Sequence, residues 1–515
     1  MFSDMSAQWL LLLIFLVLTA FVYKTNVILG KETGIPGPRG WPVIGHLPLL
    51  HRKKIVHRTM MNLAQKYGPL YELRLGMLKV LIISSPDLAK EILKIQDASF
   101  ADRPLTVMGE LFGYQRKDII YSPTDDHWRF MKKLGSEFMS SKAMQKQQVS
   151  RHETLMTAVD SLLECQQNQF IDLREELLDM MLTLIPQMLF GKRLIAGKSV
   201  AKSSESNIMK KLTQLFKELA KLDLSVVGDC FPFLRWLDVG GAEARIVKLH
   251  LQFDNILSDA MNALRREAPP ATSEDPGLMQ TLLSIQRTEE GKNITDDEIK
   301  ALVTDLFIAG IDTISSTLMF VMAELMRNPE VKEKLLKELD EVVGRERVVE
   351  ESDLVNLKYL KMVIKETFRL HPAVPFLLPR KSMGPATVAG YKVPKDTQVL
   401  INLYAIQRSP ESWDDPTSFK PERFANNLID VKGQDFCLLP FGAGRRQCPG
   451  MGLGGLMVEI TLATLLQILE FSLPAGMKPE DVDMTEEATI TSALVSPLLV
   501  SVKPRLSPNL CSMRT

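Results

Sequence analysis

The segment PFGAGRRQCPG, residues 440–450, carries the clearest chemical pattern in this chain of 515 residues. Its glycines permit a tight backbone path and the close approach of a flat ligand to the loop. A helical run begins near Gly450, and the N–H groups and positive dipole end at its start favour a thiolate at Cys448. The segment therefore predicts a metal-bound sulfur at a turn. The alternative is a buried cysteine that packs as a small hydrophobic side chain.

The segment resembles the haem-binding loop of the cytochrome P-450 superfamily, because it matches the pattern Phe-Gly-x-Gly-x-Arg-x-Cys-x-Gly in full from Phe441 to Gly450. The resemblance implies the fold of that family, mainly α with small β-sheets, and a haem b cofactor. It also implies that Cys448 ligates the haem iron and that Phe441 contacts the haem. Thiolate ligation favours cleavage of the O–O bond of dioxygen, which yields a hydroxylating oxidant.

Residues 309–313, Ala-Gly-Ile-Asp-Thr, lie in the middle of an apolar helical run, where an acid and a hydroxyl are costly unless they are used. Thr313 can bond back to the carbonyl four residues earlier, and Gly310 removes a side chain, so a pocket for dioxygen and water can open there. A kinked structural helix is the alternative. By resemblance to the family, Asp312 and Thr313 form the catalytic acid–alcohol pair that delivers protons to oxygen.

Haem propionates need cationic or N–H donors, and four side chains match family positions for this role. They are Arg103, Trp128, Arg380 and Arg446. A fifth position departs from the family, because its Trp-x-x-x-Arg pattern here ends in Lys132. Lysine keeps the charge but loses the bidentate geometry of arginine, so the contact of Lys132 with a propionate stays open. An ordinary solvated charge is the alternative for each basic residue.

Three further charged residues match family motifs that serve folding rather than chemistry. Glu366 and Arg369 share one helix face, and Arg423 follows in a Pro-Glu-Arg-Phe segment. The resemblance implies a buried network of these three behind the haem; a solvated ion pair is the alternative. His371 is expected to be structural, and Cys437 to be a packed or free thiol.

The composition is that of a globular protein, with 45% hydrophobic and 24% charged residues. Because 62 basic side chains balance 62 acidic ones, no electrostatic argument favours a nucleic-acid partner. The five cysteines are scattered and odd in number, which favours a reducing compartment over a disulfide framework.

The N-terminus predicts a membrane anchor, since residues 7–23 are apolar and about long enough to cross a bilayer. The basic residues follow this run instead of preceding it, which argues against a cleaved signal peptide and places the remainder in the cytosol. We therefore expect residues 1–30 to anchor a single-pass protein in the endoplasmic reticulum membrane and residues 31–515 to form one catalytic domain. A buried core helix or a cleaved peptide is the alternative.

The rest of the chain predicts one large, mainly helical domain. After a stiff, proline-rich connection at residues 35–42, short β-type runs at 70–75 and 80–83 flank Gly76 and suggest a hairpin. A polar loop is expected at 267–275 and a strand-like piece at 498–502. The helical stretches are expected at about 136–189, 211–222, 244–266 and 296–326, and from about 450.

The hinge, the Arg-Arg-x-Cys-Pro-Gly form of the cysteine loop, and residues 229–236 resemble the plant microsomal branch of the superfamily. That branch oxidises phenylpropanoids and flavonoids, which we favour as substrates, and terpenoids, which come next. By position, residues 106–121, 307–308, 374–377 and 491–495 line the pocket, whose apolar and aromatic composition suits a hydrophobic or phenolic molecule.

The chain has no room for flavin and nicotinamide modules, so electrons from NADPH must come through a separate protein, expected to be a diflavin reductase. It would dock on the face nearest Cys448, where basic side chains attract an acidic surface. Two other functions remain open: an electron-independent isomerase or dehydratase of an oxygenated lipid, and a non-catalytic haem-binding membrane protein. The intact Asp312-Thr313 pair counts against both.

Overall fold

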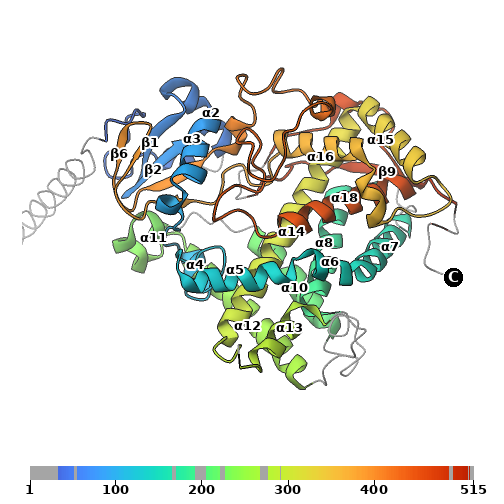
Figure 1. The fold of residues 1–515 in the computed structure, drawn as a ribbon, viewed down its shortest axis with the longest axis horizontal. Coiled ribbons are helices and arrows are strands. Elements are labelled where there is room, and N and C mark those ends of the chain that lie inside the picture. Colours follow the sequence, from blue (N-terminus) through green and yellow to red (C-terminus); the bar gives the residue numbers. More distant parts are fainter. Residues whose placement is uncertain are drawn as a thin grey trace, which may run out of the picture.

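The computed structural model describes residues 33–50, 55–164, 170–191, 205–220, 227–266, 276–289, 291–486, 491–507 and 510. Strands β1 and β2 gather at one end of the molecule, helices α7, α15 and α16 lie at the other, and α14 runs through the middle (Figure 1). The expected fold class, mainly α with small sheets, is confirmed. The predicted membrane anchor, residues 1–30, and the predicted loop at 267–275 lie outside the described residues.

The helices of the described residues are α2 (Val56–Tyr67), α3 (Pro86–Lys90), α4 (Val107–Leu111), α5 (Asp126–Phe138), α6 (Ser141–Lys146), α7 (Gln148–Glu164), α8 (Leu173–Phe190), α10 (Glu205–Ala220), α11 (Val227–Cys230), α12 (Ala242–Arg266), α13 (Gly277–Gln286), α14 (Asp296–Arg327), α15 (Pro329–Val342), α16 (Lys358–Leu370), α17 (Leu403–Ile406) and α18 (Met451–Ile468). The strands are β1 (Leu70–Leu75), β2 (Leu78–Ile83), β3 (Ile171–Asp172), β4 (Arg380–Lys381), β5 (Ala386–Val388), β6 (Tyr391–Val393), β7 (Gln398–Ile401), β8 (Leu469–Ser472) and β9 (Leu499–Pro504).

The largest sheet in the described part has the strand order β1-β2-β7-β4. Strands β1 and β2 form the predicted hairpin at Gly76, which adopts a positive φ of 61°. Strand β2 then pairs in parallel with β7, and β7 pairs antiparallel with β4. Residues 35–40 of the proline-rich segment form no helix, as predicted, and a turn begins at Pro42. The segment lies against this sheet, because the N–H of Glu72 donates to the carbonyl of Pro36 (2.9 Å).

Helix α14 is the central element of the helical part. It starts with a capping box, in which the Thr295 hydroxyl accepts from the N–H of Glu298 and the Glu298 carboxylate accepts from the N–H of Thr295. The C-terminal half of α14 is buried on all sides, and the helix as a whole packs against α8, α16 and α18. By length and composition α14 and α18 are each apolar enough to cross a membrane. Because most of each apolar stretch is buried inside the domain, they are core helices here.

Most predicted elements are confirmed, with ends shifted by a few residues. The helical stretch predicted at 136–189 is divided into shorter helices, because side-chain caps start new ones within it. Ser140 accepts a hydrogen bond from the N–H of Ala143 before α6, and Asp172 accepts one from the N–H of Arg174 before α8. Strand β3 also interrupts this stretch, and it pairs with β9 from the far end of the chain.

The predicted charged network behind the cysteine loop is confirmed. Glu366 and Arg369 on α16 are fully buried, and Arg369 Nε donates to Glu366 Oε2 (2.7 Å). Arg423 Nε donates to the other carboxylate oxygen of Glu366 (2.9 Å). The spare N–H groups of Arg369 donate to the carbonyls of Gln407, Pro416 and Ser418. A solvated ion pair is therefore excluded for these residues, and the network joins α16 to the segment that precedes the cysteine loop.

We expect Glu366→Gln to destabilise the fold by about 3–5 kcal/mol, because it leaves two buried guanidinium groups without their carboxylate. The measurement is the unfolding temperature of the full chain in detergent, followed by tryptophan fluorescence. Lys337→Gln is the control, since it removes only a solvent-exposed pair with Glu341. Equal unfolding temperatures for the two variants would contradict the structural role of the network.

Candidate active site

The cysteine loop is a tight, hydrogen-bonded turn ahead of α18. The N–H of Cys448 donates to the carbonyl of Phe441 (3.0 Å), and the N–H of Gln447 donates to that of Gly444 (3.1 Å). Gly442 and Gly444 have φ angles of 68° and 74°, which are strained for any other residue. At Gly444 a side chain would also collide with the carbonyl of Leu93 and the carboxylate of Asp97. Conformation therefore requires glycine at both positions, and space requires it at Gly444 as well.

Cys448 lies in the loop before α18, where the residue is solvent-accessible although protein groups on most sides of the thiol reduce its solvation. Burial raises the pKa of the Cys448 thiol, while the N–H of Gly450 and the ammonium group of Lys132 act in the opposite direction. The predicted helix start does supply an N–H to the sulfur. A cysteine with an accessible thiol can bind a metal that reaches it.

Three predicted arginines form a cluster close to this loop. Arg103 and Arg380 are buried, which excludes a solvated surface charge for both. Burial lowers the pKa of Arg103, and repulsion from Arg446 and Arg380 lowers it further, so the three charges lie near one another. Arg103 donates to backbone carbonyls, including that of Leu378 (2.6 Å), whereas Arg380 also pairs with Asp97 (3.0 Å).

The remaining predicted donors, Trp128 and Lys132 on α5, join the same cluster. Trp128 Nε1 and Arg446 Nη1 both donate to the carbonyl of Ile119, at 3.1 and 3.0 Å. The guanidinium group of Arg446 also lies over the indole ring, 4.3 Å from its centroid. Lys132 Nζ donates to the carbonyl of Arg445 (2.5 Å) and lies 5.1 Å from the same ring. The structure thus brings all five predicted side chains together.

This arrangement fits a haem with its two anionic propionates. In the described part of the chain, Arg103 and Arg446 have no carboxylate within ion-pair distance, and backbone carbonyls satisfy their N–H groups instead. Like charges held together in a protein interior are stabilised by an added anion. Accessible sulfur at Cys448 and uncompensated positive charge nearby are the two donor types that a thiolate-ligated haem requires.

A buried acidic pair near these donors was missed by the sequence analysis. Asp305 on α14 accepts hydrogen bonds from the N–H groups of Ile119 (2.7 Å) and Ile120 (3.3 Å). Burial raises the pKa of Asp118 to about 6, and burial together with Asp118 raises that of Asp305 well above its usual range. The two carboxyl groups interact through a side-chain hydrogen bond, which requires a proton on one of them. The pair positions Ile119, the carbonyl that Trp128 uses.

Asp312 and Thr313, the predicted proton-delivering pair, lie on α14 on the distal side of the expected haem. Thr313 Oγ1 donates to the carbonyl of Ala309 (2.7 Å), which confirms the expected back-bond, although α14 continues as an α-helix through this point. Ala309 is exposed and Gly310 is half-buried in the middle of a core helix, so this part of α14 borders an open space. Burial raises the pKa of Asp312, and a hydrogen bond from Thr491 partly offsets that rise. The carboxyl group of Asp312 can therefore hold and donate a proton beside the accessible surface at Ala309.

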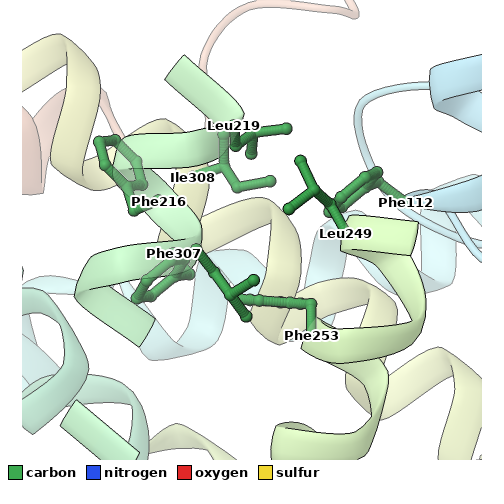
Figure 2. Close-up of a pocket in the computed structure, with 8 residues that line it drawn as sticks. Phe112, Phe216, Leu219, Leu249, Phe253, Phe307 and Ile308 are labelled. Atoms are coloured by element: carbon green, nitrogen blue, oxygen red, sulfur yellow. The ribbon is translucent and has the colours of Figure 1, made fainter. Parts of the chain in front are cut away.

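An apolar cavity lies between α4, α10, α12 and α14, and Figure 2 shows its lining side chains pointing towards one another. The space between these side chains is small and partly open to solvent. Of the predicted pocket residues, Phe307, Ile308 and Phe112 line it. Sequence reasoning missed the lining residues Leu215, Phe216, Leu219, Leu249 and Phe253. They lie on amphipathic helices, where a core-facing residue and a pocket-facing residue have the same pattern.

Comparison with known proteins agrees with this geometry. Residues 35–500 match the family model for cytochrome P450. The chain is 36% identical over 504 residues to a flavonoid 3'-monooxygenase of Arabidopsis thaliana, and the match covers 96% of each chain. It is 37% identical over 475 residues to a costunolide synthase of Tanacetum parthenium, covering 92% of this chain and 93% of the relative. A solved zebra fish cytochrome P450 with progesterone has a TM-score of 0.73 and 26% identity, covering 87% and 99%.

The chain therefore belongs to the cytochrome P450 family, and the predicted resemblance is confirmed. Membership implies a haem b cofactor, electrons supplied by a separate reductase, and a hydrophobic substrate. Among the functions that the sequence left open, the relatives support a cytochrome P450 monooxygenase of specialised metabolism.

We expect Gly444→Ala to reduce both the unfolding temperature and the fraction of purified protein that retains haem. The positive φ alone costs about 1–3 kcal/mol, and the collision with Leu93 and Asp97 adds to it. Gly455→Ala is the matched control in α18, because its methyl group meets open space and removing a helical glycine stabilises by roughly 0.5–1 kcal/mol. Full haem retention by Gly444→Ala would show that the loop tolerates a different path.

Proposed function

We propose that this protein hydroxylates a hydrophobic or phenolic molecule, with a flavonoid or another phenylpropanoid as the favoured class. One atom of dioxygen enters a C–H bond of the substrate, and the other leaves as water after taking up two electrons from NADPH and two protons, one of them from NADPH and one from solution. The observation that carries the proposal is an accessible thiol, Cys448, in a loop beside a cluster of three arginines, of which Arg103 and Arg446 form no ion pair among the described residues. Haem bound there supplies the oxygen-activating chemistry.

The roles of the cofactor-binding residues follow from their contacts. Cys448 ligates the iron, and the N–H of Gly450 stabilises its negative charge. Arg103, Arg380 and Arg446 hold the propionates, with Trp128 completing the cluster. Lys132 is already bonded to the carbonyl of Arg445, so we assign it a supporting charge rather than a propionate bond. Phe441 lies edge-on to Phe368 of α16 (5.4 Å between ring centroids), which fixes the loop against the core.

Asp312 and Thr313 supply protons at the distal side. The accessible hydroxyl of Thr313 is held on the carbonyl of Ala309, where it orients a water molecule or the oxygen that accepts the proton. Because burial raises the pKa of Asp312, its carboxyl group is protonated over a wider pH range than a solvated aspartic acid. An acid of this kind can give up a proton and regain it from water.

The cavity and the relatives support the substrate class. Its lining is entirely aliphatic and aromatic, so it favours a flat ring system or a hydrocarbon skeleton over a charged molecule. Four further relatives named flavonoid 3'-monooxygenase are 37% or 38% identical to the chain, which favours a flavonoid. The relatives named costunolide synthase favour a terpenoid as the second candidate.

We infer that residues 1–30 anchor the protein in the endoplasmic reticulum membrane as a single span and that residues 31–515 form the cytosolic catalytic domain. Exposed large hydrophobic side chains support a membrane-facing surface. Trp41 is 66% exposed and Trp236 is 79% exposed. They lie on neighbouring segments. The N–H of Met77 donates to the carbonyl of Cys230, which precedes Trp236, and Gly45, which follows Trp41, forms a β-bridge with Leu75 of β1.

The expected redox partner is a membrane-bound, NADPH-dependent diflavin reductase. The exposed side chains of Arg129 on α5 and Arg445 in the cysteine loop support docking of an acidic protein surface on the Cys448 side.

A titration of microsomes containing the protein with flavonoids, other phenolics and terpenes tests the substrate class. We expect a saturable low-spin to high-spin difference spectrum with flavonoids, because the substrate displaces water beside the iron. A shift with terpenes alone would replace the flavonoid proposal with the terpenoid one. If no compound gives a shift while the reduced carbon monoxide complex still shows thiolate ligation, both substrate classes are overturned.

We expect Thr313→Ala to consume NADPH but release hydrogen peroxide, so that product formed per NADPH falls at least about tenfold. The hydroxyl is lost, and dioxygen leaves with two electrons and two protons instead of being cleaved. Thr317→Ala is the matched control, because Thr317 makes the same back-bond one turn later but is buried. Unchanged coupling in Thr313→Ala would remove that hydroxyl from the proton path.

A further inference from the structure

Asp312 has a specific partner outside its own helix. The hydroxyl of Thr491 donates to Asp312 Oδ2 in a short hydrogen bond. The two residues are 179 positions apart in the sequence, so no local pattern links them. Thr313, the neighbour of Asp312, donates its own hydroxyl to the carbonyl of Ala309. The acid is therefore held by Thr491 and not by the alcohol with which it is paired in the sequence.

The segment that carries Thr491 is fastened to α14 and to the core. Ser316 Oγ, one turn after Asp312, donates to the carbonyl of Ser492 (2.5 Å), and the N–H of Ser492 donates to the carbonyl of Ala373 (2.8 Å). A β-bridge then joins Leu494 to Glu486. Thr491 is thus presented to the carboxyl group from a defined backbone position.

The environment of Asp312 makes this single bond important. Asp312 has no ion-pair partner among the residues that the structure describes, and its carboxyl group is largely shielded from water. Burial raises the pKa of Asp312, and the hydrogen bond from the Thr491 hydroxyl lowers it. In an apolar setting a carboxyl group without other partners turns about its χ2 angle at little cost, so one hydrogen bond decides where its oxygens point.

We propose that Thr491 is the positioning residue for Asp312, and that its hydroxyl makes proton delivery depend on the placement of the segment 491–494. This segment was predicted from the sequence to line the substrate pocket. A substrate that leaves the segment in place keeps the acid oriented, whereas one that displaces the segment releases it. The fit of the substrate in the pocket therefore determines how much product is formed for each dioxygen molecule consumed. The inference rests on the proposed role of Asp312 as the proton-delivering acid.

The test compares Thr491→Val with Thr491→Ser in the full chain, in membranes with its reductase. The substrate is the compound that gives the largest low-spin to high-spin shift in the titration of microsomes. Valine keeps the shape but removes the donor, so we expect product per NADPH to fall roughly tenfold to a hundredfold, with an unchanged KM. Serine keeps the hydroxyl and should restore coupling. Product formed per NADPH should change with the ionisation of Asp312 at a higher pH in Thr491→Val. The reason is that this variant loses a hydrogen bond to the ionised carboxylate.

Infrared difference spectra give a readout that does not depend on turnover. Asp312→Asn identifies the C=O stretching band of the Asp312 carboxyl group, and that band should move to higher wavenumber in Thr491→Val but not in Thr491→Ser. Ser316→Ala loosens the segment yet keeps the Thr491 hydroxyl, so it should reduce coupling less than Thr491→Val. An equal loss in Ser316→Ala with an unmoved band in Thr491→Val would overturn the positioning role.

Asp312→Asn separates this inference from the proposed function. If Asp312→Asn leaves coupling intact, the proposed acid is wrong and Thr491 has no proton-delivering group to position. If Asp312→Asn uncouples the reaction but Thr491→Val does not, the acid stands and the positioning role of Thr491 fails.

Discussion

Positive charge held in the interior is the constraint on which the rest of this structure depends. Arg103, Arg380 and Arg446 lie close enough to repel one another, and neutral carbonyls satisfy most of their donors. The loop beginning at Ile119, the turn before β4 and the cysteine loop must therefore present their carbonyls inward. The buried pair of Asp118 and Asp305 supports one of these loops, and because Asp305 lies on α14, it connects that helix with the charged cluster.

How far the sequence predicts the site depends on how local each interaction is. The cysteine loop, the helix bearing Asp312 and the partners of Glu366 were predictable, because each is written in a short motif with a fixed geometric consequence. The contact of Thr491 with Asp312 and the pair of Asp118 and Asp305 were not, since they join residues brought together only by the completed fold. The stretch at 136–189 has helical periodicity throughout, but side-chain caps divide it into several helices. The periodicity of the sequence alone does not show where such divisions fall.

His371 is a residue whose structural role was predictable from the sequence, although its contacts were not. The sequence predicted a structural residue, and the structure gives its reason: it joins Glu324 of α14 (2.7 Å) and Glu486 (3.4 Å) and stacks on Phe320. Burial alone lowers the pKa of His371, but the two carboxylates outweigh that effect and raise it. His57 of α2 donates to the same Glu486 (2.7 Å). One buried chain of ionisable groups thus connects α2 with the segment that holds Thr491.

The way the chain enters the domain has a mechanical consequence. Pro36 is hydrogen-bonded to β1, and from β1 an unbroken ladder passes through β2 and β7 to β4, which contains Arg380. A displacement of the first described residues therefore reaches the charged cluster through one hydrogen-bonded sheet. This sheet connects the segment that contains Pro36 with the strand that contains Arg380.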